Sequence, residues 1–118
     1  MKLMSVKIYH NPRCSKSRQT LQLLEDNGVQ AEVIQYLKTP PTAAELDKIL
    51  TLLDIQPREL MRTKEAEYKA TGMDNPDLDR NALIAGMVNT PKLIERPIVL
   101  ANGKAAIGRP PESVLEIL

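Results

Sequence analysis

Residues 6–18 read Val-Lys-Ile-Tyr-His-Asn-Pro-Arg-Cys-Ser-Lys-Ser-Arg, and the expected architecture starts from them. Apolar and polar residues alternate over 6–10, which indicates a β-strand, and the Asn-Pro pair that follows breaks the run. From about Ser15 the apolar spacing is helical, until an Asn-Gly pair at 27–28 provides a typical C-terminal stop. We therefore expect Cys14 between a strand and the N-terminus of a helix.

The middle of the chain is predicted to be mainly helical. Residues 31–37 carry an apolar Val-Ile pair and indicate a second strand, which the β-loop-α-β order places parallel to the first. The spacing over 42–45 is that of a capping box, and a stripe of Leu and Ile follows it. A short helix is predicted over 57–62, and another, containing 78–88, after an Asn-Pro-Asp turn.

The C-terminal part predicts a β-hairpin and a last helix. An Asn-Gly pair lies between 97–100 and 104–107, and both turn positions require positive φ angles. A short amphipathic helix ends the chain. This order predicts one α/β domain over residues 1–118 with a thioredoxin-like fold: a mixed four-stranded sheet flanked by helices, with a helical insertion between the second and third strands.

The composition excludes several classes of protein. Sixteen basic and fifteen acidic side chains give a net charge of +1, too little to favour binding to the phosphates of a nucleic acid. Aromatic residues make up only 3% of the chain, so stacking of bases on aromatic side chains is not favoured either. The single cysteine cannot form an internal disulfide. No charged-then-apolar leader or apolar run of about 18 residues is present, so we expect no membrane association and a cytoplasmic location.

Cys14 is the candidate nucleophile. The unpaired N–H groups and the positive dipole of a helix N-terminus stabilise a thiolate, and Arg13, Lys16 and Arg18 lie close by in the sequence. A buried, inert cysteine is the alternative, but the neighbours are polar rather than apolar. We expect Cys14 to ionise more readily than an ordinary thiol and to attack electrophiles near neutral pH.

Spacing excludes some familiar thiol sites. A dithiol oxidoreductase needs Cys-x-x-Cys, but the second position is Ser17, so an external thiol must complete any redox cycle. A thiol phosphatase has an arginine six positions after its cysteine, where this chain has Thr20. A monothiol glutaredoxin would accept Ser17 but is expected to have a small or β-branched residue where this chain has Arg96.

Two Arg-Pro pairs follow the helical block. In a thioredoxin-like fold the proline that opens the third strand is often cis and lies beside the cysteine, so Pro97 would bring Arg96 to the site. Arg109 follows one hairpin later and is expected on the same side. Guanidinium groups suit an oxyanion site because their N–H groups match pairs of oxygens and because they stay charged. Arg62 lies at what is expected to be an exposed helix end, and a surface role is favoured for it.

The loop around the cysteine supplies further candidates. His10 is the only histidine, and a structural role for it is favoured over tuning of the thiolate. Asn11, Ser17 and Arg18 are the other candidates for shaping the loop or tuning the thiol. No metal site is expected, because one Cys and one His offer too few soft ligands for structural zinc.

Together these segments resemble the motif series of the glutaredoxin-dependent arsenate reductases, which are thioredoxin-like. The likeness runs from about residue 6 to the C-terminus, in four segments with matching order and spacing: His10-Asn11-Pro12-Arg13-Cys14-Ser15-Lys16-Ser17-Arg18, Leu60-Met61-Arg62, Glu95-Arg96-Pro97-Ile98-Val99 and Gly108-Arg109-Pro110.

The resemblance implies reduction of arsenate to arsenite for arsenic detoxification. Cys14 would be the nucleophile, and Arg62, Arg96 and Arg109 would bind the oxyanion and stabilise the arsenic ester. The resemblance further implies no bound cofactor, glutathione as co-substrate, and glutaredoxin as the protein that resolves the mixed disulfide on Cys14. It implies neither a nucleic-acid nor a membrane partner.

Two other functions are compatible with the same fold. A redox-responsive transcription regulator of the Spx type binds RNA polymerase and shares the Arg-Pro-Ile segment, but such proteins usually carry Cys-x-x-Cys, which Ser17 interrupts. A glutathione-disulfide oxidoreductase without arsenic specificity would reduce small mixed disulfides and would not depend on Arg96. The arginine set favours the arsenate reductase.

Overall fold

The computed structural model describes residues 5–118 of the chain. Contacts divide the chain into two compact units, one formed by the described residues up to Thr39 together with Arg96–Leu118, the other by Pro40–Glu95. The first unit is therefore built from two separate stretches of sequence. A single domain over 1–118 stays a prediction, and residues 1–4 of that range lie outside the described residues.

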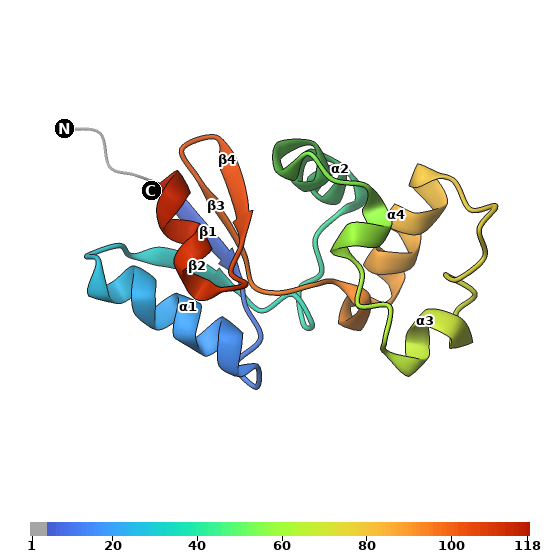
Figure 1. The fold of residues 1–118 in the computed structure, drawn as a ribbon, viewed down its shortest axis with the longest axis horizontal. Helices are drawn as coiled ribbons and strands as arrows, with labels where there is room; N and C mark the ends of the chain where they lie inside the picture. The colour runs from blue at the N-terminus through green and yellow to red at the C-terminus, as the bar shows by residue number, and fades with distance from the viewer. Residues whose placement is uncertain (1–4) are drawn as a thin grey trace. The chain divides into compact units, whose positions relative to one another are not determined.

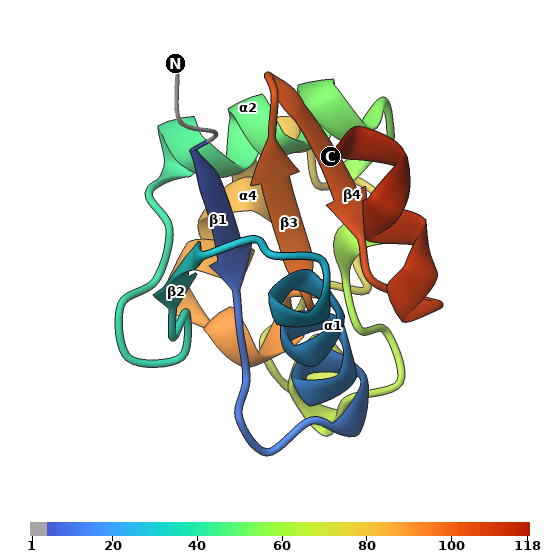
Figure 2. The same ribbon diagram turned by 90° about the vertical axis from the view of Figure 1, so that its left-hand side faces the viewer.

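The first unit is a four-stranded mixed sheet with helices on it, as expected (Figures 1 and 2). The strands lie in the order β2-β1-β3-β4; β1 is parallel to β2, while β3 is antiparallel to both β1 and β4. The elements of this unit are β1 (Val6–Tyr9), α1 (Ser15–Asp26), β2 (Ala31–Ile34), β3 (Ile98–Ala101), β4 (Lys104–Ile107) and the 3₁₀ helix η3 (Pro111–Ile117). The mixed sheet predicted from the sequence is confirmed.

One face of this sheet carries the core of the unit. Side chains alternate between the faces of a strand, and the register pairs Ile8 of β1 with Val99 of β3, so both point to the same side. Leu24 of α1 and Val114 of η3 cover them there, and all four are fully buried. Figure 2 shows α1 and the C-terminal helix in front of the strands. The amphipathic pattern of the strands thus determines where both helices pack.

The hairpin between β3 and β4 has the turn that its sequence predicts. Asn102 and Gly103 have φ angles of 54° and 72°, in the left-handed region that Asn and Gly tolerate best. The side-chain amide of Asn102 also donates to the carbonyl oxygen of Ile117 at 2.9 Å. This turn residue therefore ties the hairpin to η3.

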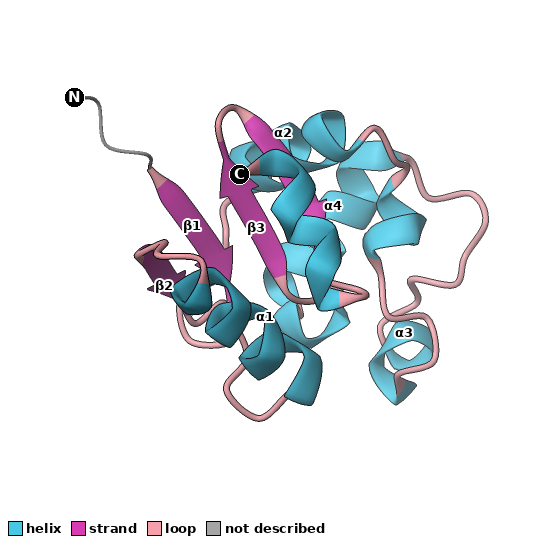
Figure 3. Ribbon diagram, turned by 60° about the vertical axis from the view of Figure 1, so that its left-hand side comes forward, coloured by secondary structure: helices cyan, strands magenta, loops and turns pink. Residues whose placement is uncertain are grey.

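The second unit is the helical insertion between β2 and β3. Figure 3 shows it without a β-strand among the described residues. α4 contacts α2, η1 and η2, so it is the central helix of the unit. None of the helices within residues 5–118 is long and apolar enough to cross a membrane. The elements are α2 (Ala43–Leu53), η1 (Pro57–Leu60), α3 (Ala66–Ala70), α4 (Arg80–Asn89) and η2 (Pro91–Leu93).

Several predicted element boundaries were wrong. β2 ends at Ile34 rather than at 37, because Gln35 begins a turn whose carbonyl accepts from two later N–H groups. Leu78 precedes α4, because the Asn75 side chain closes a local turn and Asp79 caps the helix instead. The last helix, η3, is a 3₁₀ helix. The helix predicted over 57–62 is η1, which ends at Leu60. The short helix α3 was not predicted.

Arg58 holds the longest irregular part of the second unit. Its guanidinium group donates to the Tyr68 hydroxyl at 2.7 Å and to the carbonyl oxygens of Met73 and Asn75 at 2.6 and 2.5 Å. These contacts join η1 to α3 and to the segment that follows it. A guanidinium group suits this task because its donors are fixed in one plane and remain charged.

Replacing Thr42 with Ala tests the predicted capping box of α2. The Thr42 hydroxyl accepts from the Glu45 N–H at 3.1 Å, and the Glu45 carboxylate accepts from the Thr42 N–H at 2.9 Å. Thr42→Ala should lower the free energy of unfolding by about 1 kcal/mol, measured by urea denaturation. Thr39→Ala, at an exposed position outside any helix, is the control and should change it little. An equal decrease in the free energy of unfolding in both variants would contradict a contribution of the capping box to stability.

Candidate active site

Three segments of the first unit converge at one edge of the sheet. Because β3 runs antiparallel to β1, it begins where β1 ends, and β4 then ends at that same edge. The register shows this directly, since Ile98 pairs with both Tyr9 and Ile107. The side chains that follow or precede these strand ends include those of Cys14, Arg96 and Arg109.

The loop between β1 and α1 is held by its own polar groups. The Cys14 N–H donates to the carbonyl oxygen of Asn11 at 3.0 Å, which closes a turn. The Asn11 side-chain oxygen accepts from the Arg13 N–H at 3.0 Å, and the Arg18 guanidinium donates to the carbonyl oxygen of Pro12 at 3.0 Å. Asn11 and Arg18, both predicted to shape the loop, make contacts of that kind.

His10 and Ser17 form a buried pair beneath this loop. The Ser17 hydroxyl oxygen accepts from the Asn11 N–H at 3.0 Å and lies 2.6 Å from His10 Nδ1. With its oxygen already accepting, the hydroxyl is placed to donate to Nδ1, and we assign the ring as neutral with its proton on Nε2. Burial, and then the positive charge of Arg18, lower the pKa of His10, which agrees with a neutral ring.

Cys14 occupies the N-cap position of α1, with only 9% of its surface exposed. Burial by itself would raise the pKa of the Cys14 thiol. The Ser17 N–H, the charge and hydrogen bonding of Arg96, and the Lys16 N–H act in the opposite direction and hold the pKa of Cys14 below its ordinary value. The first turn of α1 and one guanidinium group therefore stabilise the thiolate together.

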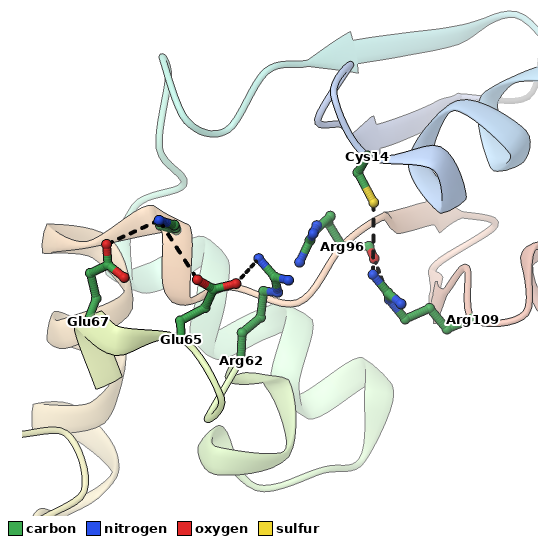
Figure 4. Close-up of polar contacts among 7 residues, drawn as sticks. Cys14, Arg62, Glu65, Glu67, Arg96 and Arg109 are labelled. Carbon is green, nitrogen blue, oxygen red and sulfur yellow. Dashed lines mark hydrogen bonds and ion pairs between the residues drawn. The ribbon is translucent and has the colours of Figure 1, made fainter. Parts of the chain in front are cut away.

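Arg109 approaches the sulfur from the end of β4. Its Nη2 lies 3.9 Å from Cys14 Sγ, and its Nε donates to the carbonyl oxygen of Arg96 at 2.9 Å (Figure 4). Of the two arginines, Arg96 is the one that lowers the pKa of the Cys14 thiol. The contact between Arg109 and the Arg96 carbonyl fixes the spacing of the two arginine-bearing segments.

Gly108 permits this close approach and was not singled out from the sequence as a site residue. Its N–H donates to the Pro97 carbonyl oxygen at 2.9 Å. A Cβ added at Gly108 would lie 2.5 Å from Thr20 Oγ1 and 2.7 Å from Pro97 Cγ, so no larger residue fits without a shift. The peptide bonds before Pro97 and Pro110 are both cis. The only sequence signal was a glycine directly preceding Arg109, and nothing local indicated the contact with Thr20.

Arg62 belongs to the second unit. Its N–H donates to the carbonyl oxygen of Leu93 at 2.7 Å, and its guanidinium group pairs with the Glu65 carboxylate at 2.6 Å. The structure thus brings Cys14, Arg96 and Arg109 together within one unit and describes Arg62 in the other. Its assignment to the oxyanion site stays a prediction.

Within residues 5–118 no group of three or more His, Cys, Asp or Glu side chains is placed to hold a metal ion. The site instead combines a stabilised sulfur nucleophile with fixed positive charge. Such a combination suits an electrophile that carries negative charge, because the charge that attracts the substrate also stabilises the thiolate that attacks it.

A thioredoxin-like sheet with a single activated cysteine at the start of its first helix defines a class of thiol-dependent proteins. Residues 9–117 match the ArsC family, and the chain belongs to that family. This confirms the resemblance found in the four sequence segments.

Several known proteins are similar over almost the whole chain. The uncharacterized protein YfgD of Escherichia coli K12 is 60% identical, over 96% of both chains. The arsenate reductase of Neisseria meningitidis is 54% identical, over 96% of this chain and 97% of its own. The solved structure of an arsenate reductase from Vibrio cholerae matches with a TM-score of 0.95 at 52% identity, covering 99% of this chain and all of that one.

Alkylation of Cys14 as a function of pH tests the stabilised thiolate. Since the thiol pKa is lowered, the rate with iodoacetamide should reach half its maximum below the ordinary thiol value of about 8.5. Arg96→Ala should move this midpoint upward, because it removes a positive charge beside the sulfur. Arg13→Ala removes the same charge at the adjacent residue, whose guanidinium is not among the groups that lower the pKa, and should leave the midpoint in place. A wild-type midpoint at the ordinary value would contradict the activation.

Ser17→Ala tests the buried pair beneath the loop. The substitution leaves the Asn11 N–H and His10 Nδ1 without the hydroxyl, and the free energy of unfolding should fall by about 1–3 kcal/mol. Ser15→Ala, at the exposed first position of α1, is the matched control and should have little effect. Thermal or urea unfolding measures both. The alkylation midpoint should change less in Ser17→Ala than in Arg96→Ala, because the Ser17 backbone N–H remains.

Proposed function

We propose that this protein reduces arsenate to arsenite, with Cys14 as the nucleophile and glutathione and glutaredoxin as the source of electrons. The observation that carries the proposal is the Cys14 sulfur, which lies beside Arg96 and Arg109 and has a lowered pKa. The arsenate reductases named above, at 54% and 52% identity over nearly the full chain, support arsenate as the substrate.

In the first step the Cys14 thiolate attacks As(V). An S–As bond forms, an As–O bond breaks, and the oxygen leaves as hydroxide, which takes up a proton to become water. The negative charge of the resulting thiol ester of arsenate stays on its oxygens. Arg96 and Arg109 stabilise that charge, since guanidinium groups beside the sulfur are also beside the arsenic bonded to it. Arg62 is proposed as the third arginine, on the strength of its sequence segment.

Reduction then needs a second thiol, because the chain has one cysteine. A glutathione thiolate attacks the Cys14 sulfur; an S–S bond forms, the S–As bond breaks, and its electron pair remains on arsenic, which becomes As(III). Arsenite leaves, and Cys14 is left in a mixed disulfide with glutathione. Glutaredoxin takes over the glutathione moiety by thiol–disulfide exchange and regenerates the Cys14 thiolate.

A coupled assay tests this function. Arsenate-dependent NADPH oxidation is measured in the presence of glutathione, glutaredoxin and glutathione reductase, with wild type and Cys14→Ser compared at equal concentration. Wild type should turn over and Cys14→Ser should not, because a serine hydroxyl is not ionised near neutral pH and cannot form the S–As bond. Replacing glutaredoxin with a thioredoxin system is the control for the electron source and should abolish turnover.

Two results would contradict the proposal. Failure of wild type to oxidise NADPH in response to arsenate would exclude the reaction. The second result is that the protein reduces a small glutathione mixed disulfide and shows no turnover of arsenate. If Arg96→Ala then leaves that disulfide reduction unchanged, the protein is a glutathione-disulfide oxidoreductase. In an arsenate reductase, Arg96→Ala should lower turnover by about a hundredfold or more, as for the loss of other donors to a developing oxyanion.

A further inference from the structure

Exposed positive charge flanks Cys14 in the loop and in the first turn of α1. Arg13, Lys16 and Arg18 are all exposed, and the first acidic residue in the sequence is Glu25. Among residues 5–118 none of these three cations takes part in an ion pair, although η3, which has two glutamates, packs against α1. The whole chain carries a net charge of only +1, so the positive charge beside the thiol is a local excess.

Two of these cations have no contact within the part of the chain that the structure describes. The Arg18 guanidinium donates to the carbonyl oxygen of Pro12 at 3.0 Å and so helps to hold the loop. The side chains of Arg13 and Lys16, in contrast, make no hydrogen bond or ion pair with any residue of 5–118. Neither side chain is among the groups that lower the pKa of Cys14, because the contribution of Lys16 comes from its backbone N–H. Both charges are therefore available to a partner.

The last step of the proposed cycle brings a protein surface to this loop. A glutaredoxin thiolate attacks the glutathione sulfur that is joined to Cys14; a new S–S bond forms, the S–S bond to Cys14 breaks, and its electron pair returns to Cys14 as the thiolate. Cys14 is only 9% exposed, so the partner must come close to the loop for this transfer. The exposed residues nearest to Cys14 in the chain, Arg13, Ser15 and Lys16, then lie at the edge of the contact.

We propose that Arg13 and Lys16 form a docking surface for glutaredoxin and meet acidic side chains that surround the partner's reactive cysteine, an inference that rests on the proposed function. Exposed charges add little to the strength of a single ion pair, because water and salt screen them. Charges of opposite sign on two approaching surfaces do raise the rate of association, and they select against partners of like charge. The surface therefore favours an acidic glutaredoxin through the rate of encounter.

The rate of the resolving step tests this surface directly. The mixed disulfide of Cys14 with glutathione is made with oxidised glutathione, and its loss on adding the reduced glutaredoxin of the coupled assay is followed by mass spectrometry. At low salt, Arg13→Glu and Lys16→Glu should each lower the second-order rate constant by about three- to tenfold, and the difference from wild type should disappear at about 1 M salt. Lys104→Glu reverses an exposed charge at the opposite edge of the sheet and should leave the rate constant unchanged.

Two small thiols distinguish a docking surface from an effect on the sulfur. Cleavage of the same disulfide by 2-mercaptoethanol, which is uncharged, should be equally fast in wild type and both variants. An equally large decrease with glutathione as the reductant would show that the cations bind the tripeptide, and would overturn the inference. Unchanged rates with glutaredoxin, or a decrease that persists at high salt, would overturn it as well. Absence of arsenate turnover would overturn the proposed function instead, since this disulfide is made without arsenate.

Discussion

The antiparallel pairing of β3 with β1 brings together residues that are far apart in the sequence. Cys14 and Arg109 are separated by 95 positions, yet their side chains are in contact because β1 and β4 end at the same edge of the sheet. Shifting the register by one residue would turn each side chain of β3 to the opposite face and remove Val99 from the core. Burial of one sheet face therefore also determines the geometry of the site.

The chemistry of Cys14 depends on local rather than overall charge. The whole chain carries a formal net charge of only +1, which gives no general attraction for anions. At the thiol, burial opposes ionisation, and N–H groups of α1 together with Arg96 overcome that opposition. In the proposed reaction the groups that stabilise the thiolate also bind the oxyanion, so one set of residues would serve both the nucleophile and the substrate.

Local signals predicted the parts of the fold that local interactions form. The capping box of α2, the Asn102-Gly103 turn and the strand-to-helix junction at Cys14 each depend on residues close in sequence. Contacts over long distances in the sequence were not predictable in this way: the close approach of Gly108 to Thr20 and the three acceptors of Arg58 depend on how distant segments fold together. The five-residue helix α3 was missed because a single turn has little periodicity.

The division of the first unit into two stretches of sequence has a consequence for synthesis on the ribosome. The N-terminal stretch, with Cys14 and the first turn of α1, emerges first, and the whole of Pro40–Glu95 must be translated before Arg96 and Arg109 appear. Until β3 pairs with β1, the nascent chain carries the cysteine without either guanidinium group. The contribution of Arg96 to the stabilisation of the thiolate is therefore added only when the last strands are in place, after the contribution of α1.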